Sequence, residues 1–187
     1  MSLNTVGLTH DFMARHVQPG DLCIDATAGR GRDTVFLCGL VGEEGHVLAF
    51  DIQQQAVDAT RLLLRQQGVA NRAQVLLDSH IHMNRYACPG TVSCIAFNFG
   101  YLPGGDHNIF TRPDSSIAAI EQGLELLRPG GVMSLAIYSG GDTGYEERDA
   151  LLAYLKMLDQ KKYTVLVTHF FNRPNDPPIP VFILKEP

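Results

Sequence analysis

A glycine turn between two acidic side chains is the part of the sequence whose residue types and spacing could do chemistry. Gly29 and Gly31 lie between Asp25 and Asp33, after the apolar run 22–24 and before a helical pattern. Neither glycine carries a Cβ, so the backbone can pass close to a ligand, and the helix that follows aims unpaired N–H groups at the same place. The turn predicts a site for a nucleotide-like cofactor.

A third acid supports this prediction. Asp51 ends the apolar run 46–50 and comes 20 residues after Gly31. In an open α/β sheet, an acid in this place lies at the carboxyl end of the second strand and can accept hydrogen bonds from both ribose hydroxyls. A lone glycine turn is more often only a tight turn, and that alternative stays open, but the spaced acid favours a cofactor site.

Two residues bear on the identity of the cofactor. Thr34 stands where the dinucleotide fingerprint has a third small residue, which disfavours NAD. Asp25 comes at a strand end, where a carboxylate can pair with an ammonium group, and S-adenosylmethionine has such a group whereas NAD does not. We therefore expect S-adenosylmethionine as the cofactor.

Alternating strand and helix patterns predict the framework that must position these residues. Apolar runs predict the first five strands, over residues 22–24, 46–50, 73–77, 92–97 and 132–137. Helical periodicity with glycine and proline stops predicts helices over residues 6–18, 34–40, 53–67, 114–127 and 145–160. Because helices alternate with these strands, the strands should run parallel in one sheet.

The last two predicted strands, 163–170 and 180–184, are joined only by the loop 171–179. This loop is too short for a helical crossover, so the two strands should be antiparallel neighbours. The predicted fold is α/β and Rossmann-like: a seven-stranded, mostly parallel sheet with one antiparallel strand from the C-terminal hairpin and helices on both faces. This is the arrangement of class I methyltransferases, and we expect residues 1–187 to form one domain.

The composition narrows the classes of protein further. The chain has 187 residues, of which 45% are hydrophobic and 19% are charged, and no apolar run approaches the ~20 residues of a membrane span. The N-terminus shows no basic region followed by an apolar core, so we expect a cytoplasmic protein without a membrane partner. The four cysteines form no C-x-x-C pair, and Cys23 and Cys94 lie in apolar runs, so we expect neither a metal nor a disulfide.

The charge of the chain bears on its partners. A net charge of −5 and a pI near 5.7 argue against broad, nonspecific attraction to nucleic acid, and we expect no DNA partner. A local patch of arginines could still bind RNA, although most surface arginines are simply solvated. The sequence leaves a homodimer open.

Motifs in five parts of the chain resemble the class I, S-adenosylmethionine-dependent proteins labelled rRNA methylases. They are residues 25–34 (DATAGRGRDT), 50–53 (FDIQ), 98–107 (NFGYLPGGDH), 138–147 (YSGGDTGYEE) and 172–178 (NRPNDPP). The likeness covers nearly the whole chain and implies the methyltransferase fold, activity and cofactor. Because the family includes a bacterial tRNA enzyme, it also implies N-methylation of the aminomethyl group of 5-aminomethyl-2-thiouridine at the tRNA wobble position, with the anticodon loop as partner.

The cofactor is expected to contact residues near the ends of four strands. They are Asp25, Ala28, Gly29, Arg30, Gly31, Arg32, Asp33, Asp51, Ile52, Gln53, Asp78, Ser79, His80 and Asn98. The resemblance implies that Asp51 binds the ribose and that Ser79 and His80 lie near the adenine.

Plain structural roles stay open for some of these residues. Asp33 and Ser79 could cap helices, and Gln53 could face solvent. Arg30 and Arg32 depart from the family, which typically has Asn at the first position and His or Asn at the second. By the resemblance, side chains at these two positions suit contact with the methionine end of the cofactor.

Methyl transfer from a sulfonium is an in-line displacement, so the protein must align an unprotonated nucleophile with the methyl carbon. Asn98 and Tyr101 belong to a stretch that resembles the Asn-Pro-Pro-Tyr stretch of amino-group methyltransferases, with Gly100 breaking the match. We predict that Asn98 and Tyr101 position the substrate amine and that Asp106 or His107 takes its proton. A rigid turn and a local Asp–His hydrogen bond are the alternatives.

The substrate should lie beyond the carboxyl ends of the strands, where ligands bind in open α/β sheets. We predict that it contacts Gly100, Tyr101, Leu102, Pro103, Tyr138, Asn175, Pro177 and Pro178. RNA bases could stack on Tyr101, Tyr138 or Phe171, although core packing is the favoured role for Phe171. A plain strand connector is the alternative for the proline pair.

Other functions stay open. The runner-up is a methyltransferase that acts on another RNA site or on a small amine or hydroxyl metabolite, which the acidic pI favours. An NAD-dependent oxidoreductase comes next. A noncatalytic nucleotide-binding module ranks last, because polar clusters close four of the predicted strands.

Overall fold

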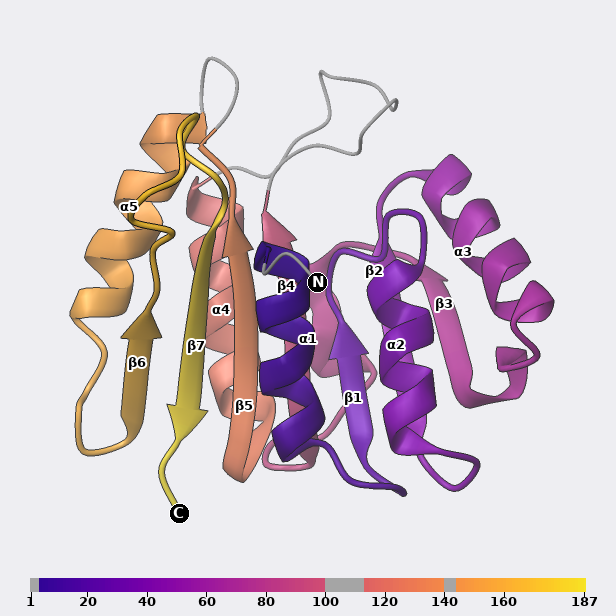
Figure 1. Ribbon diagram of the computed structural model, residues 1–187. Helices are drawn as coiled ribbons and strands as arrows, with labels where there is room; N and C mark the ends of the chain where they lie inside the picture. The colour runs from indigo at the N-terminus through magenta and orange to yellow at the C-terminus, as the bar shows by residue number, and fades with distance from the viewer. Residues whose placement is uncertain (1–3, 100–112, 140–143) are drawn as a thin grey trace.

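The computed structural model describes residues 4–99, 113–139 and 144–187 (Figure 1). Its helices are α1 (Thr5–His16), α2 (Arg32–Val41), α3 (Gln54–Gln66), α4 (Pro113–Leu126) and α5 (Gly144–Lys156), with short 3-10 helices η1 (Ala70–Arg72) and η2 (His80–Arg85). Its strands are β1 (Leu22–Asp25), β2 (His46–Asp51), β3 (Ala73–Leu77), β4 (Val92–Phe99), β5 (Leu127–Ile137), β6 (Tyr163–Val167) and β7 (Ile179–Lys185).

One sheet carries the seven strands, in the order β3-β2-β1-β4-β5-β7-β6. The β1, β2, β3, β4 and β5 pairings are parallel, whereas β7 runs antiparallel to both β5 and β6. The predicted sheet, with one antiparallel strand from the C-terminal hairpin, is confirmed. The carboxyl ends of the parallel strands all lie along the upper edge in Figure 1.

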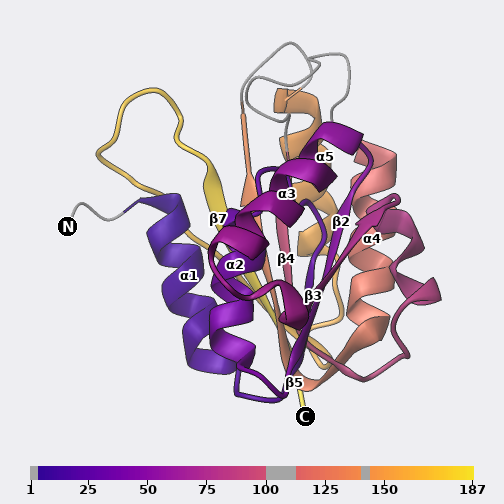
Figure 2. The same cartoon turned by 90° about the vertical axis from the view of Figure 1, so that its right-hand side faces the viewer.

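Helices cover both faces of the sheet, with α1, α2 and α3 on one side and α4 and α5 on the other (Figure 2). Successive residues of the central strands supply the two cores in alternation, as the period-2 geometry of a strand requires. Ile24 and Ile95 belong to the core under α4 and α5, and their neighbours Cys23 and Cys94 to the core under α1 and α2. The prediction that these two cysteines are core residues is confirmed, since both are fully buried.

Most element bounds differ from the sequence prediction by one or two residues, and three bounds and one helix face differ in a way that needs a comment. β5 begins at Leu127 rather than at residue 132, because Leu127 pairs with Val92 ahead of a register shift. α5 ends at Lys156 and β6 at Val167, both earlier than predicted. On α1 the buried side chains include Thr5, Thr9 and Met13, while the larger apolar side chains of Leu8 and Phe12 are only half-buried.

Within residues 4–99, 113–139 and 144–187, no helix combines the length and the apolar character that crossing a membrane requires.

Candidate active site

The turn after β1 brings both glycines into the left-handed region of φ. Gly29 has φ 53° and Gly31, at the start of α2, has φ 79°. A Cβ on Gly31 would lie 3.0 Å from the Cα of Thr60 on α3, and the Thr60 Oγ1 donates to the Gly29 carbonyl at 3.1 Å. Gly31 is therefore required by the close approach of α3, a reason that the sequence prediction of ligand access did not include.

Asp51 links the glycine turn after β1 to the segment that follows β2. Its Oδ2 accepts from the Gly29 N–H and its Oδ1 from the Gln53 N–H, both at 2.9 Å. A carboxylate has about four acceptor positions, so both oxygens can accept further hydrogen bonds. The next side chain, Ile52, is 55% exposed and presents apolar surface beside this carboxylate.

Asp25 lies beneath the turn and is fully buried. Its carboxyl group accepts from the Thr34 hydroxyl at 2.6 Å and from the Thr27 N–H at 3.2 Å. Burial and the negative charge of Asp33 raise the pKa of Asp25 to about 7. Asp25 thus shapes the turn from inside the protein, while Asp33 stands closer to the surface with 17% of its side chain exposed.

Asp33 links α1, α2 and β4 through two hydrogen bonds. Its Oδ1 accepts from the His10 Nε2 at 2.7 Å, and its Oδ2 accepts from the Asn98 Nδ2 at 2.5 Å. The His10 ring is stacked on Phe36 with the ring centroids 3.7 Å apart. The Asn98 backbone N–H donates to the Thr27 hydroxyl at 2.7 Å. Because the Asn98 amide donates through Nδ2, it presents its carbonyl Oδ1 as an acceptor.

The segment after β3 is held by Asp78. Its carboxylate accepts from the Ser79 N–H at 2.7 Å, the His82 Nδ1 at 2.6 Å and the Tyr86 hydroxyl at 2.9 Å. The His82 hydrogen bond is the main reason that the pKa of Asp78 falls to about 2. The Ser79 Oγ accepts from the N–H of Ile81, so this serine caps η2, as the structural alternative predicted.

His80 stands under the turn that follows β1. Burial lowers the pKa of its ring, which is therefore neutral at pH 7. Its Nδ1 lies 3.2 Å from the Ala26 carbonyl and donates to it, which leaves Nε2 as an acceptor. The edge of the ring contacts Phe97, at a centroid distance of 6.0 Å.

Tyr138 and the β6–β7 loop flank the same edge of the sheet. Tyr138 follows β5 and is 41% exposed, and burial and the Asp33 charge raise the pKa of its phenol. In the loop, Pro177 and Pro178 are half-buried and Asn175 is exposed. Tyr138 and this loop therefore lie at the same edge of the sheet as Asp33 and its partner Asn98.

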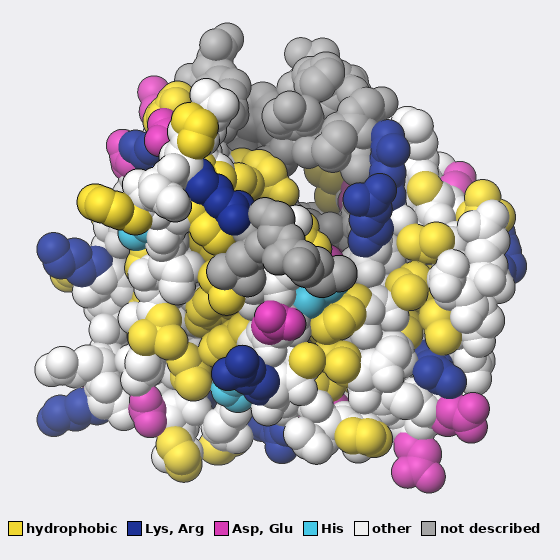
Figure 3. Space-filling model, viewed as in Figure 1, with side chains coloured by type: hydrophobic (Ala, Val, Ile, Leu, Met, Phe, Trp, Pro, Cys, Tyr) yellow, Lys and Arg dark blue, Asp and Glu magenta, His cyan; other side chains and the backbone are white. Residues whose placement is uncertain are grey.

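Basic side chains lie along this edge as well. Figure 3 shows them on either side of the hollowed upper edge of the molecule, with hydrophobic side chains between them. Arg30 and Arg32, at the start of α2, are both exposed. Six predicted residues lie outside the described part of the chain: Gly100, Tyr101, Leu102, Pro103, Asp106 and His107.

Comparison with known proteins gives this geometry a family. The family model described as "Putative rRNA methylase" matches residues 47–184. The chain belongs to this rRNA methylase family. A chloroplastic tRNA (mnm(5)s(2)U34)-methyltransferase of Arabidopsis thaliana is 34% identical over an alignment of 187 positions, which covers 95% of this chain and 68% of the relative.

Solved structures agree with the family assignment. An rRNA-methylase structure from Clostridium thermocellum has 45% sequence identity and a TM-score of 0.95, with 99% of each chain covered. A methyltransferase from Streptococcus mutans, solved in complex with SAH, has 37% identity and a TM-score of 0.89, again with 99% of each chain covered. The protein is therefore a methyltransferase with the Rossmann-like fold that its strand order shows.

Two contributors to this rRNA methylase site escaped the sequence prediction. His10 binds Asp33 from a different helix, 23 residues earlier, and Thr60 binds the glycine turn from α3. No spacing rule joins such positions, so only the packed structure could identify them. Phe171 was expected to pack in the core, and this prediction was wrong, because its side chain is fully exposed.

Proposed function

We propose that this methylase transfers a methyl group to the aminomethyl nitrogen of 5-aminomethyl-2-thiouridine at the wobble position of tRNA. The observation that carries the proposal is the Asp33–Asn98 hydrogen bond of 2.5 Å, which fixes the Asn98 amide at the carboxyl edge of the sheet. A fixed amide carbonyl can accept an N–H of the substrate amine. The name of the Arabidopsis relative supports the choice of nucleoside.

The methyl donor of the reaction is identified by the family of the chain. The chain is an S-adenosylmethionine-dependent methyltransferase, as its family and the SAH-bound structure at 37% identity show. This cofactor supplies a methyl group on a positively charged sulfur. The residues at the ends of β1 and β2 fit this cofactor, because acidic and apolar side chains lie side by side there.

The cofactor-binding residues follow from this fit. We assign the ribose hydroxyls to Asp51, whose oxygens keep acceptor capacity beyond their two backbone hydrogen bonds. The exposed Ile52 gives the adenine an apolar contact, and Ser79 and His80 line the far side of the adenine site. Asp33 provides the negative charge for the methionine end, with Asp25 buried beneath it.

The rest of the predicted cofactor set surrounds these groups. It comprises Ala28, Gly29, Arg30, Gly31, Arg32, Gln53, Asp78 and Asn98. Its backbone is ordered by the protein's own hydrogen bonds, such as that from the Gly31 N–H to the Ala28 carbonyl at 2.7 Å. A site that is ordered before the ligand arrives loses less conformational entropy on binding.

The Asn98 amide does the positioning in the proposed mechanism. Its carbonyl accepts one N–H of the amine, so the nitrogen lone pair is directed at the methyl carbon. The N–C bond forms as the S–C bond breaks, and the nitrogen then releases a proton to Asp106 or His107. Tyr101 would stack on the modified base, with the segment 100–103 around it.

The substrate side is assigned to the opposite flank of the same sheet. Tyr138, Asn175, Pro177 and Pro178 border the predicted path of the anticodon loop. Both flanks share one continuous sheet from β3 to β6, so we assign the activity to a single domain over residues 1–187.

Methyl transfer to tRNA tests this function. The purified protein is incubated with labelled S-adenosylmethionine and tRNA that carries unmethylated 5-aminomethyl-2-thiouridine, and the nucleosides are separated and weighed by mass spectrometry. We expect label on the wobble nucleoside with wild type and its loss with Asn98→Ala. Label on another nucleoside, or on a small amine but not on tRNA, would contradict the proposal.

A further inference from the structure

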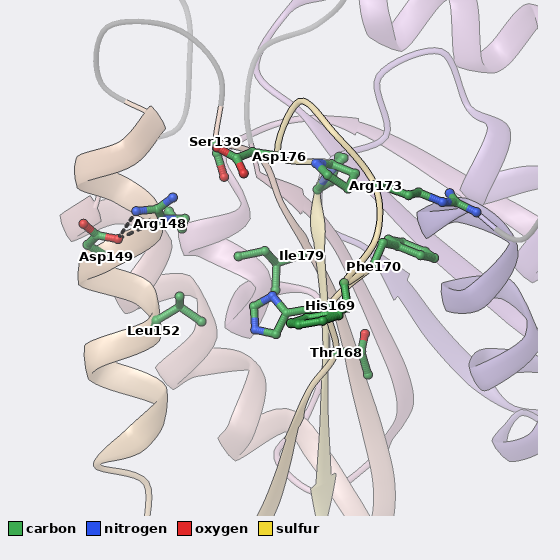
Figure 4. Close-up of a pocket in the computed structure, with 13 residues that line it drawn as sticks. Ser139, Arg148, Asp149, Leu152, Thr168, His169, Phe170, Arg173, Asp176 and Ile179 are labelled. Atoms are coloured by element: carbon green, nitrogen blue, oxygen red, sulfur yellow. Dashed lines mark hydrogen bonds and ion pairs between the residues drawn. The ribbon is translucent and has the colours of Figure 1, made fainter.

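A hollow of about 350 Å³ lies between α5 and the β6–β7 loop, next to the end of β5 (Figure 4). Its volume falls in the range of about 300–1,000 Å³ that small-ligand sites occupy. We propose that this α5 hollow is a nucleotide subsite, which binds an RNA nucleotide beside the one that is methylated. The inference rests on the proposed RNA substrate and adds contacts that the proposed function does not name.

Phe171 at the wall of the hollow is the first observation. Its side chain is fully exposed, at 102% of the reference area. An exposed ring of this size suits a partner that covers it, and single-stranded bases stack on such rings whatever their sequence. A phenyl ring without a polar atom fits the face of a base better than it fits a phosphate.

Arginines stand on both walls of the hollow. Arg148 projects from α5, with its Cζ 4.9 Å from the centroid of the Tyr145 ring, and Arg173 projects from the loop, with its Cζ 4.3 Å from the centroid of the Phe170 ring. Guanidinium groups held over rings can contact both a phosphate and a base. The two walls therefore supply charge next to a stacking surface.

Acids in the lining limit what the hollow can bind. Arg148 forms an ion pair with Asp149 at 2.7 Å, and Asp176 lies on the loop side. The Asp149 side chain is 67% exposed, so its pairing with Arg148 is weak enough for a phosphate to compete. This mixed charge suits one nucleotide in a defined place and explains why the protein needs no net positive charge to hold it.

The loop is shaped as a fixed platform. Asn175 and Asp176 have φ angles of 67° and 39°, so two successive residues without glycine's freedom adopt the left-handed region. The Thr5 hydroxyl of α1 donates to the Pro178 carbonyl at 2.9 Å, and the Thr168 hydroxyl donates to the Pro180 carbonyl at 2.9 Å. These bonds hold the loop in its shape before RNA arrives, which reduces the entropy that binding costs.

The hollow lies close to the proposed reaction site along the chain. Ser139, which lines it, directly follows Tyr138, whose phenol is near enough to Asp33, the partner of Asn98, for the Asp33 charge to raise the pKa of the phenol. An RNA strand whose modified nucleoside reaches Asn98 can therefore place a neighbouring nucleotide in the α5 hollow. The subsite adds contacts between the enzyme and the RNA that do not depend on the cofactor.

Fluorescence anisotropy with a labelled anticodon stem-loop RNA tests the subsite. Phe171→Ala should weaken RNA binding about tenfold, which is the scale of one lost base stack, and Phe171→Tyr should bind like wild type. Met157→Ala removes another exposed apolar side chain, which is 82% exposed beyond the end of α5, and should leave binding unchanged. Arg173→Gln should weaken binding and reduce the salt dependence by about one phosphate contact.

Each outcome of this experiment decides the matter. The subsite is overturned if wild type does not bind the RNA, or if Phe171→Ala binds it as tightly as Phe171→Tyr does. Selective loss with Phe171→Ala supports it. If that loss is seen but the wild type does not methylate the wobble nucleoside, the subsite stands and the proposed function fails.

Discussion

The two halves of the sheet differ in the side chains that they present at their strand ends. On the β3-β2-β1 half, the polar groups at the strand ends bond to one another, as Asp51 does to Gly29 and Thr34 does to Asp25. On the β4-β5-β7-β6 half, aromatic side chains such as Tyr138 and Phe171 remain open to solvent. A small, unchanging cofactor suits a site built from internal hydrogen bonds, whereas a large RNA suits an open surface.

The largest effect should be on stability and should come from Asp25, which lies in the β3-β2-β1 half. We call this part of the sheet the cofactor half. Its pKa is about 7 in the folded protein against 3.8 in the unfolded chain, so the folded state holds the proton more tightly in between. The contribution of Asp25 to the free energy of unfolding should be fully present below about pH 4, and roughly 4 kcal/mol of it should be lost as the pH rises through 7. Urea unfolding across this range measures the slope.

Asp25→Asn isolates this contribution. The amide keeps an oxygen for the Thr34 hydroxyl but carries no titrating proton, so the variant should lose less stability than wild type as the pH rises. Equal slopes for the two proteins would show that Asp25 does not titrate in this range. The cofactor half would then owe its order to other groups.

Asp51→Ala should reduce S-adenosylmethionine affinity about 100-fold, because it removes a charged acceptor and frees two backbone N–H groups. Isothermal titration calorimetry measures the loss. Asp58→Ala is the matched control, since this exposed acid on α3 bonds only to Gln54 among the described contacts. Unchanged affinity in Asp51→Ala would remove the ribose assignment.

Asn98→Ala should lower kcat about 30-fold and lower cofactor affinity much less, because the main role of the lost amide is to align the amine. Steady-state kinetics with saturating S-adenosylmethionine gives the value. Asn84→Ala, an exposed position on η2, serves as control. A loss confined to cofactor binding would move Asn98 from the substrate side to the cofactor side.

The smallest effect should follow from His10→Phe, which keeps a ring on Phe36 but removes the hydrogen bond to Asp33. We expect kcat to fall about tenfold, through a less firmly held Asn98 amide. His10→Gln can still donate to Asp33 and should recover part of the rate, whereas a purely structural role would show the same rate for both variants.

Local patterns made the cofactor half predictable. The glycine turn, Asp25 and Asp51 lie within 27 residues of sequence, and each follows a strand that an apolar run predicts. The parallel order of the strands followed from alternating elements. These features depend on short-range rules, so the sequence sufficed for them.

Long-range packing made the rest unpredictable. The His10–Asp33 bond joins two helices, and the place of Gly31 depends on Thr60 from a third. Phe171 was assigned to the core, but its loop projects from the sheet (Figure 2), so the ring has no core to enter. Leu127 was predicted to end the helix 114–127, yet it begins β5 because it pairs with Val92.

Steady-state kinetics of Asp51→Ala and Phe171→Ala test most directly whether one half of the sheet binds the cofactor and the other half binds RNA. KM is measured for S-adenosylmethionine and for tRNA bearing 5-aminomethyl-2-thiouridine in both variants and in wild type. We expect that Asp51→Ala raises only the KM for S-adenosylmethionine and that Phe171→Ala raises only the KM for tRNA. An increase of the same KM in both variants would contradict this expectation.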